Sequence, residues 1–314
     1  MDTYSRKSGL SGQDAVNGLK TAGIEFLENG NMSAYSSIKI GGTADLMIFP
    51  KNEEELLFIL NLLKANLSDY YIIGRGTNVL FKDDRICSPV ISFKKFAANF
   101  YENKKNGSEI ILEAGSGASL SKILNYAIKN DIGGCEFFYG IPGTLGGAVA
   151  MNAGSKESVI GNIIEKIEII TDAGDKFTVK KDGMKFSYRN LEIKDIGGNY
   201  FITKAYLTLL KSNGLKISEN MEIFKKRKSS QPLGEYSLGC IFKNPSGQCA
   251  GKIIEEIGLK GFSQGDAAVS QKHANFIINK GGARPEDITS LIKIIQEKAL
   301  SIKNIKLNTE IKII

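Results

Sequence analysis

Apolar residues recur along this chain of 314 residues with two spacings, and each spacing predicts a type of element. In residues 52–66 (NEEELLFILNLLKAN) they repeat at helical spacing behind Asn52 and three acidic residues, which predicts a helix with Asn52 as its N-cap. Short apolar runs at 46–50 and 70–74 predict buried strands on either side of this helix. An amphipathic pattern predicts a second helix at 119–130, so this part of the chain is expected to mix helices and strands.

The middle of the chain carries strand patterns. The segments at 165–171 and 175–180 are joined by a TDAGD turn and predict a hairpin, and the apolar run at 200–210 predicts a long strand. After KSNG at 211–214 the pattern becomes helical, with helices expected at 218–232, 250–258 and 285–304 and a last strand at 306–314. Because these elements do not alternate with a regular β-α-β period, the expected fold class is α+β rather than a doubly wound parallel sheet.

Length and patterning also predict how the chain divides into domains. A domain holds about 150 residues, so a chain of 314 residues suggests two domains. Residues 1–30 are polar and unpatterned, and are expected to form a partly mobile N-terminal extension. The change of pattern at KSNG then separates a first domain over 31–211 from a second domain over 212–314.

Charge and the histidine count argue against several kinds of function. The net charge is +7, from 41 Lys and Arg against 34 Asp and Glu, but only six of the cations are Arg and the rest are scattered lysines. Nucleic-acid-binding proteins cluster their cations and use Arg forks, so no nucleic-acid partner is expected. The single histidine, His273, excludes a zinc site with two His ligands, and no metal ion is expected.

The cysteines and the N-terminal sequence indicate the cellular compartment in which the protein is expected. None of the four cysteines lies in a C-x-x-C pair; they are Cys87, Cys135, Cys240 and Cys249. Residues 1–20 lack the apolar stretch of a signal peptide, so a reducing, cytoplasmic location is expected. The longest uncharged run, 137–155, contains five Gly and one Pro and lacks sustained apolarity, so no membrane insertion is expected.

Two glycine-rich segments are the strongest candidates for chemistry. IIGRGTNVL at 72–80 follows an apolar strand, and its glycines allow successive backbone N–H groups to form an anion nest. In GIPGTLGGAVAMNAG at 140–154, Thr144 can cap a helix of small residues whose N-terminus would face a pyrophosphate. Neither segment matches the dinucleotide fingerprint or the Walker P-loop. Each alone could be a structural turn, but together they favour a large phosphate-bearing cofactor.

Seven motifs occur in an order that carries a resemblance to a known family. They are SSIKIGGTADLMIFP, IIGRGTNVLFKDD, FFYGIPGTLGGAVAMNAG, FSYRN, QPLGEYSLGCIFKNP, GLKGFSQGDAAVSQKHANFIIN and LNTEIKII. Together they resemble the bacterial UDP-N-acetylenolpyruvoylglucosamine reductases, also called UDP-N-acetylmuramate dehydrogenases, from about Leu27 to Ile314. The segment between SYRN and KSNG is short and holds no inserted loop with a Tyr, which resembles the more compact of the family's two types.

The resemblance implies a fold, a reaction and a cofactor. The fold would be an FAD-binding domain of the vanillyl-alcohol-oxidase (PCMH) type, made of two subdomains, followed by a smaller α+β substrate-binding domain. The family uses NADPH to reduce the enolpyruvyl ether of a UDP-sugar, UDP-N-acetylglucosamine enolpyruvate, to UDP-N-acetylmuramate in peptidoglycan biosynthesis, and no obligatory protein partner is evident. Neither glycine-rich segment offers a residue placed for a covalent flavin bond except Tyr139, so FAD is expected to bind non-covalently. The expected FAD contacts are Gly74, Arg75, Gly76, Thr77, Asn78, Val79 and Leu80 in the first segment and Ile141, Pro142, Gly143, Thr144, Gly146, Gly147, Asn152, Ala153 and Gly154 in the second.

The chemistry of that reaction suits residues that the motifs contain. Adding hydride to an enol ether conjugated to a carboxylate creates an enolate, which needs charge stabilisation and then a proton. By resemblance, Arg189 in FSYRN and Glu310 near the C-terminus stabilise the enolate, and Cys240 occupies the position of the proton donor, where the family commonly has Ser. A thiol, with an ordinary pKa of about 8.5, is a stronger acid than an alcohol and is still mostly protonated at neutral pH. The expected substrate-binding residues are Tyr188, Arg227, Gln231, Lys243 and Asn244.

Two other functions remain open at this point. The chain could be an alcohol or sugar oxidase on the same flavin fold, which would reoxidise its flavin rapidly in air, but this leaves the motifs from Cys240 to Glu310 unexplained. It could instead bind a flavin or nucleotide without catalysis, yet Arg189, Glu310 and a usable acid are all present.

Overall fold

The N-terminal region is folded from its first described helix onwards. The computed structural model describes residues 12–65, 69–82, 84–155 and 158–314. The expectation of an unpatterned extension over 1–30 is wrong for the described part, because α1 (Gly12–Thr21) and β1 (Phe26–Asn31) lie within it; residues 1–11 fall outside the described residues. Leu19 on α1 is fully buried in a cluster shared with α2 (Glu53–Ala65). A single apolar stripe on a short helix is too little to show as a period in the sequence.

A small mixed sheet follows, built around the strand expected at 46–50. Its strand order is β1-β2-β6-β3 with β5 beside β2, and the further strands are β2 (Thr43–Ile48), β3 (Tyr71–Ile73), β5 (Arg85–Ile86) and β6 (Val90–Ser92). α2 connects β2 to β3, as expected, and Asn52 is its N-cap, since its side chain accepts the Glu55 N–H at 2.9 Å. This sheet and helix place the first glycine-rich segment directly after β3.

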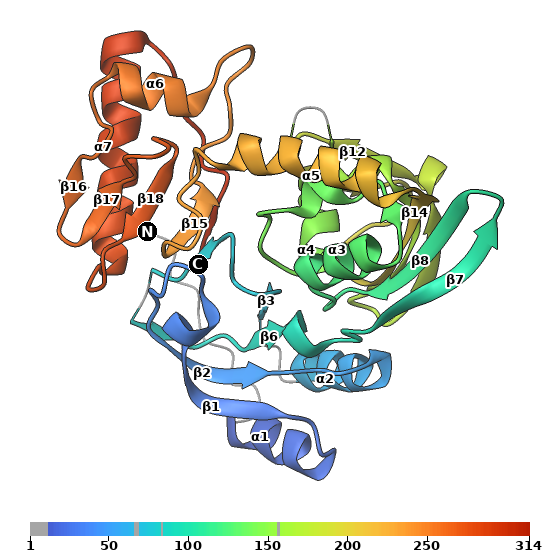
Figure 1. Ribbon diagram of the computed structural model, residues 1–314. Coiled ribbons are helices and arrows are strands. Elements are labelled where there is room, and N and C mark those ends of the chain that lie inside the picture. The colour runs from blue at the N-terminus through green and yellow to red at the C-terminus, as the bar shows by residue number, and fades with distance from the viewer. Residues whose placement is uncertain (1–11, 66–68, 83, 156–157) are drawn as a thin grey trace.

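A larger antiparallel sheet forms the middle of the molecule (Figure 1). Its order is β11-β10-β14-β8-β7 with β9 beside β14, and the strands are β7 (Phe100–Asn106), β8 (Glu109–Gly115), β9 (Ile132–Gly133), β10 (Ile164–Thr171), β11 (Lys176–Lys180) and β14 (Tyr200–Lys211). The hairpin predicted at 165–180 is the β10–β11 pair. Three helices contribute to the core on one face of this sheet: α3 (Leu120–Lys129), α4 (Leu145–Ala150) and α5 (Gly214–Lys228).

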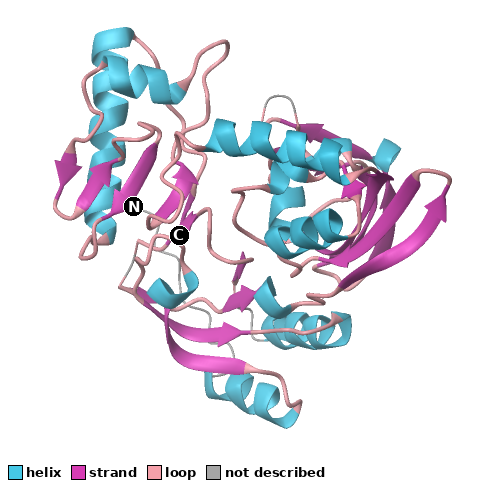
Figure 2. Ribbon diagram, viewed as in Figure 1, coloured by secondary structure: helices cyan, strands magenta, loops and turns pink. Residues whose placement is uncertain are grey.

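The C-terminal part is a second α+β unit (Figure 2), and its core also includes Ile38, Ile40 and Leu80 from the first part of the chain. Its sheet has the order β15-β18-β17-β16, with β15 (Ser237–Cys240), β16 (Ser263–Gln264), β17 (Ala267–Val269) and β18 (Phe276–Asn279). The helices α6 (Ala250–Glu256) and α7 (Pro285–Lys303) bury Ile253, Ile254 and Leu291 in this core. Within the described ranges, no helix is both long and apolar enough to cross a membrane.

The helix expected at 218–232 and the domain boundary expected before it both differ in the structure. The helix is α5, which begins earlier because Asn213 caps it by accepting a first-turn backbone N–H at 2.9 Å. Ile217 and Met221 on α5 are buried in the core of the middle sheet. α5 therefore packs with the middle sheet, although it follows KSNG, where the sequence analysis places the start of the second domain.

The last strand is much shorter than expected. Of residues 306–314, only β19 (Lys312–Ile313) is strand, and it pairs in parallel with the equally short β4 (Val79–Leu80). The C-terminal segment thus returns to the first glycine-rich segment.

Candidate active site

The two glycine-rich segments lie against each other. Thr77 Oγ1 donates a hydrogen bond to Pro142 O at 3.3 Å, and a Cβ built on Gly74 would lie 2.5 Å from Thr144 Oγ1. Gly76 has φ of +62°, and a Cβ there would lie 2.0 Å from a neighbouring carbonyl oxygen, so only glycine fits. The loops at 74–78 and 140–144 are therefore in contact, which is the arrangement that the prediction of a shared cofactor requires.

The N-terminus of α4 is not open to a ligand, and the prediction that it faces a pyrophosphate is wrong. Thr144 does cap the helix, accepting the Gly147 N–H at 3.4 Å. The N–H groups of Leu145 and Gly146, however, both donate to backbone carbonyls of the segment before α3 at 2.8 Å. Among the described residues, the backbone N–H groups at 75–78 have no acceptor. Donors for a phosphate are therefore available from the first loop, while α4 anchors the second.

Two buried hydroxyl groups beside these loops have no hydrogen-bond partner in the part of the chain that the structure describes. One is Ser36, whose Cα would lie 3.2 Å from a Cβ on Gly76. The other is Ser116, whose Cβ would lie 2.6 Å from a Cβ on Gly146. An unsatisfied buried hydroxyl costs about 1–3 kcal/mol, so a polar ligand between the loops would stabilise this arrangement. The residues present fit a dinucleotide cofactor such as FAD.

Arg189 is presented at the tip of a hairpin. The strands β12 (Met184–Ser187) and β13 (Asn190–Ile193) pair antiparallel, so Tyr188 and Arg189 form the turn between them. Arg189 has φ of 57°, in the left-handed region, which costs about 1–2 kcal/mol for a residue with a Cβ. A strained backbone at a turn is typical of residues that a protein holds in place for function.

Asn152 holds this hairpin against the segment that follows α4. Its side chain is buried, its Nδ2 donates to Ser187 O at 2.9 Å, and its Oδ1 accepts the Gly161 N–H at 3.1 Å. Asn152 is one of the FAD contacts expected from the sequence. Its amide is engaged within the protein, so the structure gives it a part in orienting Arg189.

Arg189 and Glu310 form an ion pair that joins the hairpin to the C-terminal segment. Arg189 Nε donates to Glu310 Oε1 at 2.6 Å, and Arg189 Nη1 donates to Gly154 O at 3.1 Å. The two side chains are only 18% and 11% exposed. Burial raises the pKa of Glu310, although the charges of Arg189 and Lys243 act to lower it. Two of the three guanidinium nitrogens are thus engaged with protein acceptors.

The backbone of Glu310 connects the first loop to the strand that carries Cys240. Its N–H donates to Ile241 O at 2.7 Å, and its carbonyl accepts the side-chain amide of Asn78, 232 residues earlier in the chain, at 3.3 Å. Asn78 is another expected FAD contact. Its side chain supports Glu310, and its backbone carbonyl accepts the Lys312 N–H at 3.0 Å.

Cys240 lies at the end of β15, where the charges of Arg189 and Glu310 affect the pKa of its thiol. The pKa of its thiol is raised to about 12, mainly by burial and also by the Glu310 carboxylate, while the charges of Arg189 and Lys228 act to lower it. The thiol is therefore protonated at neutral pH. Asn275 fixes the chain immediately after it, because its side chain both accepts the Phe242 N–H at 2.9 Å and donates to Phe242 O at 2.8 Å. The three catalytic residues expected from the sequence thus come together.

The expected substrate-binding residues lie beside Arg189, directly after the Cys240 strand and at the end of α5. Tyr188 lies beside Arg189, and its hydroxyl accepts the Asn244 N–H at 3.2 Å. The Asn244 side chain in turn accepts the first backbone N–H of α6 at 2.9 Å. The charge of Lys243 acts to lower the pKa of the Glu310 carboxyl group. The other two, Arg227 and Gln231, lie at and just after the end of α5, where the Arg227 guanidinium sits 5.5 Å from the centre of the Phe224 ring.

The structure adds two residues that the sequence analysis did not single out. Asn275, described above, was considered only as part of the motif around His273. Lys228, the last residue of α5, interacts electrostatically with Cys240, Arg189 and His273. In the sequence it belongs to the run KKRK, which predicts only the polar end of a helix. No signal in the sequence separates it from its exposed neighbours.

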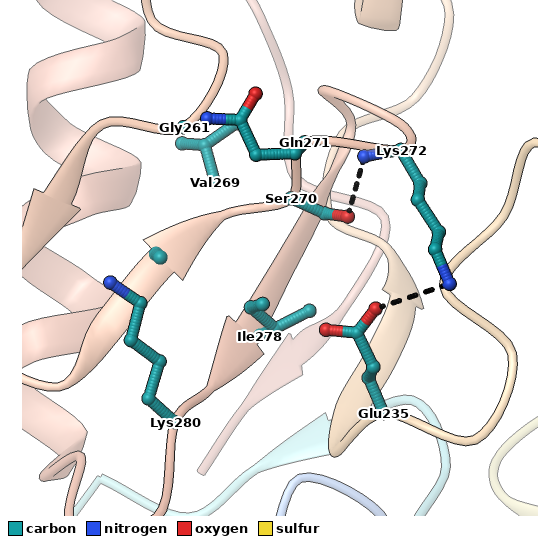
Figure 3. A pocket seen from close by; sticks show the side chains of 9 residues that line it. Glu235, Gly261, Val269, Ser270, Gln271, Lys272, Ile278 and Lys280 are labelled. Atoms are coloured by element: carbon teal, nitrogen blue, oxygen red, sulfur yellow. Dashed lines mark hydrogen bonds and ion pairs between the residues drawn. The ribbon is translucent and has the colours of Figure 1, made fainter.

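A separate cavity of about 250 Å³ lies on the C-terminal sheet (Figure 3). Apolar residues of β17 and β18 line it, and Lys272 and Glu235 form an ion pair of 3.8 Å at its rim. It shares no lining residue with the cluster of Arg189, Cys240 and Glu310, and so it is separate from that cluster. The described residues also contain no group of side chains that could hold a metal ion.

Comparisons with known proteins agree with this division of the molecule. Residues 44–180 match the family of FAD binding domains, and residues 231–314 match the UDP-N-acetylenolpyruvoylglucosamine reductase C-terminal domain. A UDP-N-acetylenolpyruvoylglucosamine reductase of Clostridium novyi is 40% identical over 291 residues, covering 92% of each chain. The chain belongs to the UDP-N-acetylenolpyruvoylglucosamine reductase family.

Other members of this family support the same assignment. The reductase of Syntrophobacter fumaroxidans is 36% identical over 293 residues, covering 93% of this chain and 84% of that protein. The crystal structure of the reductase from Thermus caldophilus superposes with a TM-score of 0.77 at 29% identity, over 92% of this chain and 98% of that one. The start of the matched C-terminal domain at residue 231 agrees with a division after α5.

Membership of the reductase family confirms several predictions. The fold is an α+β FAD-binding domain followed by a C-terminal domain, and the chain is an FAD-dependent oxidoreductase. The family takes part in peptidoglycan synthesis and uses NADPH as its hydride donor. What the individual residues do in this chain is a separate question.

Proposed function

We propose that this chain uses NADPH to reduce UDP-N-acetylglucosamine enolpyruvate to UDP-N-acetylmuramate. The observation that carries the proposal is the convergence of Arg189, Glu310 and Cys240 next to the two glycine-rich loops. These residues come from three distant parts of the chain, and together they supply the cation, the polarising carboxylate and the acid that this reduction requires.

The loops at 74–80 and 140–154 would hold FAD without a covalent bond. The N–H groups at 75–78, which have no acceptor among the described residues, suit its pyrophosphate, and Ser36 and Ser116 offer further hydroxyl groups. When bound and reduced, FAD supplies the hydride that adds to the carbon–carbon double bond of the substrate. The protein's own contribution is to bind, orient and protonate that substrate.

Arg189 stabilises the negative charge that the substrate develops around its carboxylate. Because its Nε and Nη1 donate to Glu310 and Gly154, Nη2 and the overall charge of Arg189 remain for the substrate. Glu310 holds the guanidinium in this orientation. The strained turn fixes the direction in which the Arg189 side chain leaves the hairpin.

Cys240 completes the reaction by giving its proton to the carbon beside the carboxylate. The S–H bond breaks, a C–H bond forms from the electron pair of the enolate, and a thiolate remains. Because the pKa of the thiol is about 12, the proton is present before the reaction throughout the neutral range. An alcohol at the same position would be a weaker acid still.

The C-terminal unit would hold most of the UDP-sugar. Lys243 and Asn244 follow the proton donor and can reach phosphate and amide groups. Tyr188 adds a ring beside Arg189, and Arg227 and Gln231 lie at and just after the end of α5. All four cysteines are free, in keeping with the proposed location in the cytoplasm, where thiols stay reduced.

The purified protein tests the proposal directly. It should be yellow, release FAD into the filtrate when denatured, and oxidise NADPH only when UDP-N-acetylglucosamine enolpyruvate is supplied. An oxidase on the same fold would reoxidise reduced flavin rapidly in air without the UDP-sugar. A flavin-binding protein without catalysis would leave the UDP-sugar unchanged under all conditions.

A further inference from the structure

Asn275 has no role in the reaction as described so far, although its side chain bonds to the strand that follows Cys240. It lies just before β18, in the motif that also contains His273, and it is only 3% exposed. Its Oδ1 accepts the Phe242 N–H at 2.9 Å and its Nδ2 donates to Phe242 O at 2.8 Å. The amide thus bonds to Phe242 as the peptide group of a neighbouring strand would.

The segment 241–243 is held from two sides. On one side, the backbone carbonyl of Asn275 accepts the Ile241 N–H at 2.8 Å, in addition to the two bonds of the Asn275 side chain. On the other side, the Glu310 N–H donates to Ile241 O at 2.7 Å, and the Lys243 N–H donates to Asn308 O at 2.8 Å. Asn275 and the segment that carries Glu310 therefore flank the same short stretch of backbone.

The three residues proposed to catalyse the reaction are all attached to this stretch. Cys240 directly precedes Ile241, and Glu310 is bonded to Ile241 through its backbone. Arg189 is held in turn by the Glu310 carboxylate at 2.6 Å. A shift of the stretch would move the acid and the ion pair relative to the substrate, and a misplacement of about 1 Å can cost about 100-fold in rate.

His273 supports Asn275 from the side of α6. Its Nδ1 accepts the Asn275 N–H at 3.2 Å, and a Cβ on Gly251 of α6 would lie 3.0 Å from His273 Cε1. Burial lowers the pKa of His273, which keeps Nδ1 free to accept this bond at neutral pH. The backbone of Asn275 is thus fixed independently of its side chain.

We propose that Asn275 is a positioning residue for proton donation, whose amide holds Cys240 and Glu310 in the relative position that the second half-reaction needs. The inference rests on the proposed function of Cys240 as the proton donor. Asn275 does not touch the reacting atoms and exchanges no proton in this scheme. Reduction of the flavin by NADPH needs no acid from Cys240, so it should not depend on Asn275.

Asn275→Asp tests the amide at an almost unchanged shape. An ionised carboxylate cannot donate to Phe242 O and repels it, whereas a protonated carboxyl group can accept the Phe242 N–H and donate to Phe242 O, as the amide does. Burial raises the pKa of a carboxyl group by up to about 3–5 units from its ordinary value of about 3.9. The variant should therefore resemble the parent at low pH and lose the bond as the pH rises.

Other titratable and charged groups act on this region from several elements. They are His273 on the same segment, Cys240 on β15, Lys228 at the end of α5, Glu255 on α6, Lys260 after α6, Lys243 after β15, and Glu310 on the C-terminal segment. All of them are also present in the parent, so the ratio of the variant rate to the parent rate reports the new carboxyl group.

The experiment follows the second half-reaction by stopped flow. FAD-loaded protein with its flavin already reduced is mixed with UDP-N-acetylglucosamine enolpyruvate between pH 6 and pH 9. The rate of Asn275→Asp should lie within about threefold of the parent at pH 6 and should be about ten- to hundredfold lower at pH 9. Flavin reduction by NADPH should keep the parent rate throughout.

Two further measurements accompany these rates. Asn52→Asp is the matched control, because Asn52 is an exposed N-cap and Asp caps a helix equally well, so it should follow the parent at every pH. Urea unfolding without FAD gives a readout that is independent of activity. Relative to the parent, the stability of Asn275→Asp should decrease as the pH rises towards the raised pKa of the new carboxyl group.

Two results would overturn the role of Asn275. One is a rate ratio that stays constant between pH 6 and pH 9, and the other is flavin reduction by NADPH that slows as much as the second half-reaction. If Asn275→Asp loses FAD, the uncharged Asn275→Ser replaces it; its second half-reaction should be about ten- to hundredfold slower at every pH, and the parent rate would overturn the inference. Parent activity in Cys240→Ala would instead overturn the proposed function of Cys240, whereas a constant ratio together with an impaired Cys240→Ala would overturn only the role of Asn275.

Discussion

Removing the side-chain amide of Asn152 should loosen the turn that presents Arg189. In Asn152→Ala, the buried Gly161 N–H loses its acceptor, which costs about 1–3 kcal/mol. The carbonyl of the exposed Ser187 loses the Asn152 amide as its donor and accepts a hydrogen bond from water instead, at a cost of about 1 kcal/mol. Asn152 has φ of 42°, and alanine tolerates this left-handed backbone less well by about 1 kcal/mol. The sum is a loss of about 3–5 kcal/mol from the free energy of unfolding.

Asn152→Gly is the matched control, because it removes the same amide but accepts a positive φ. It should be more stable than Asn152→Ala by about 1 kcal/mol. Urea unfolding followed by circular dichroism measures both values, since the chain has no Trp. Both variants should retain FAD but lose turnover, because the direction of Arg189 is no longer fixed.

Two results would refute this reasoning about Asn152. If Asn152→Ala unfolds within 1 kcal/mol of the parent at unchanged turnover, the two hydrogen bonds do not hold the hairpin. If it keeps its stability without cofactor but loses FAD, Asn152 is instead a direct FAD contact, as the sequence alone suggested.

Three further predictions concern the acid, the cation and the stability of the middle sheet. Cys240→Ser should keep substantial turnover, whereas Cys240→Ala should lose about 10²–10⁴-fold in the second half-reaction, measured by stopped flow, with flavin reduction by NADPH intact. Arg189→Lys should keep the FAD content, measured by absorbance, and lose most of its turnover because the planar guanidinium is lost; turnover at the parent rate would remove Arg189 from the mechanism. Burial acts to raise the pKa of Glu113, but the hydrogen bonds from Tyr101 and Lys204 outweigh burial and lower it. The ionised Glu113 carboxylate therefore stabilises the fold at neutral pH, and this stabilisation is lost as the pH falls through the lowered pKa. Glu113→Gln should therefore be less stable by about 1–3 kcal/mol in urea at pH 7, with a difference that shrinks in acid; an equal difference at both pH values would contradict it.

Long and strongly patterned elements could be predicted from the sequence. The helix behind Asn52 and the strands of the β10–β11 hairpin carry their period and their end signals locally, and they occur where expected. Short strands such as β12 and β13 were missed, because four residues with one buried face do not establish a period. These two strands carry the turn with Arg189, so the motif was recognised while its structural setting was not.

The site was predicted in part for a similar reason. Arg189, Cys240 and Glu310 are marked by motifs, and the structure brings them together. Whether a backbone N–H group is free for a ligand depends on three-dimensional packing. The N–H groups of Leu145 and Gly146 already donate to backbone carbonyls, and a run of glycines in the sequence does not reveal this. The burial of Lys228 likewise depends on where α5 ends in space, and one lysine among four basic residues carries no sign of it.

The pairing of β19 with β4 has a consequence for the order of events during synthesis. β4 and Asn78 find their partners in the last residues of the chain, and the bond from Asn78 to Glu310 spans 232 positions. A ribosome adds about 5–20 residues per second, so the first loop waits on the order of ten seconds or more for the segment that supports it. Closing so long a loop is also entropically unfavourable, which delays it further relative to local contacts. FAD capture should therefore be a late step of maturation, and a nascent chain halted before Glu310 should be folded in its middle sheet yet unable to retain the flavin.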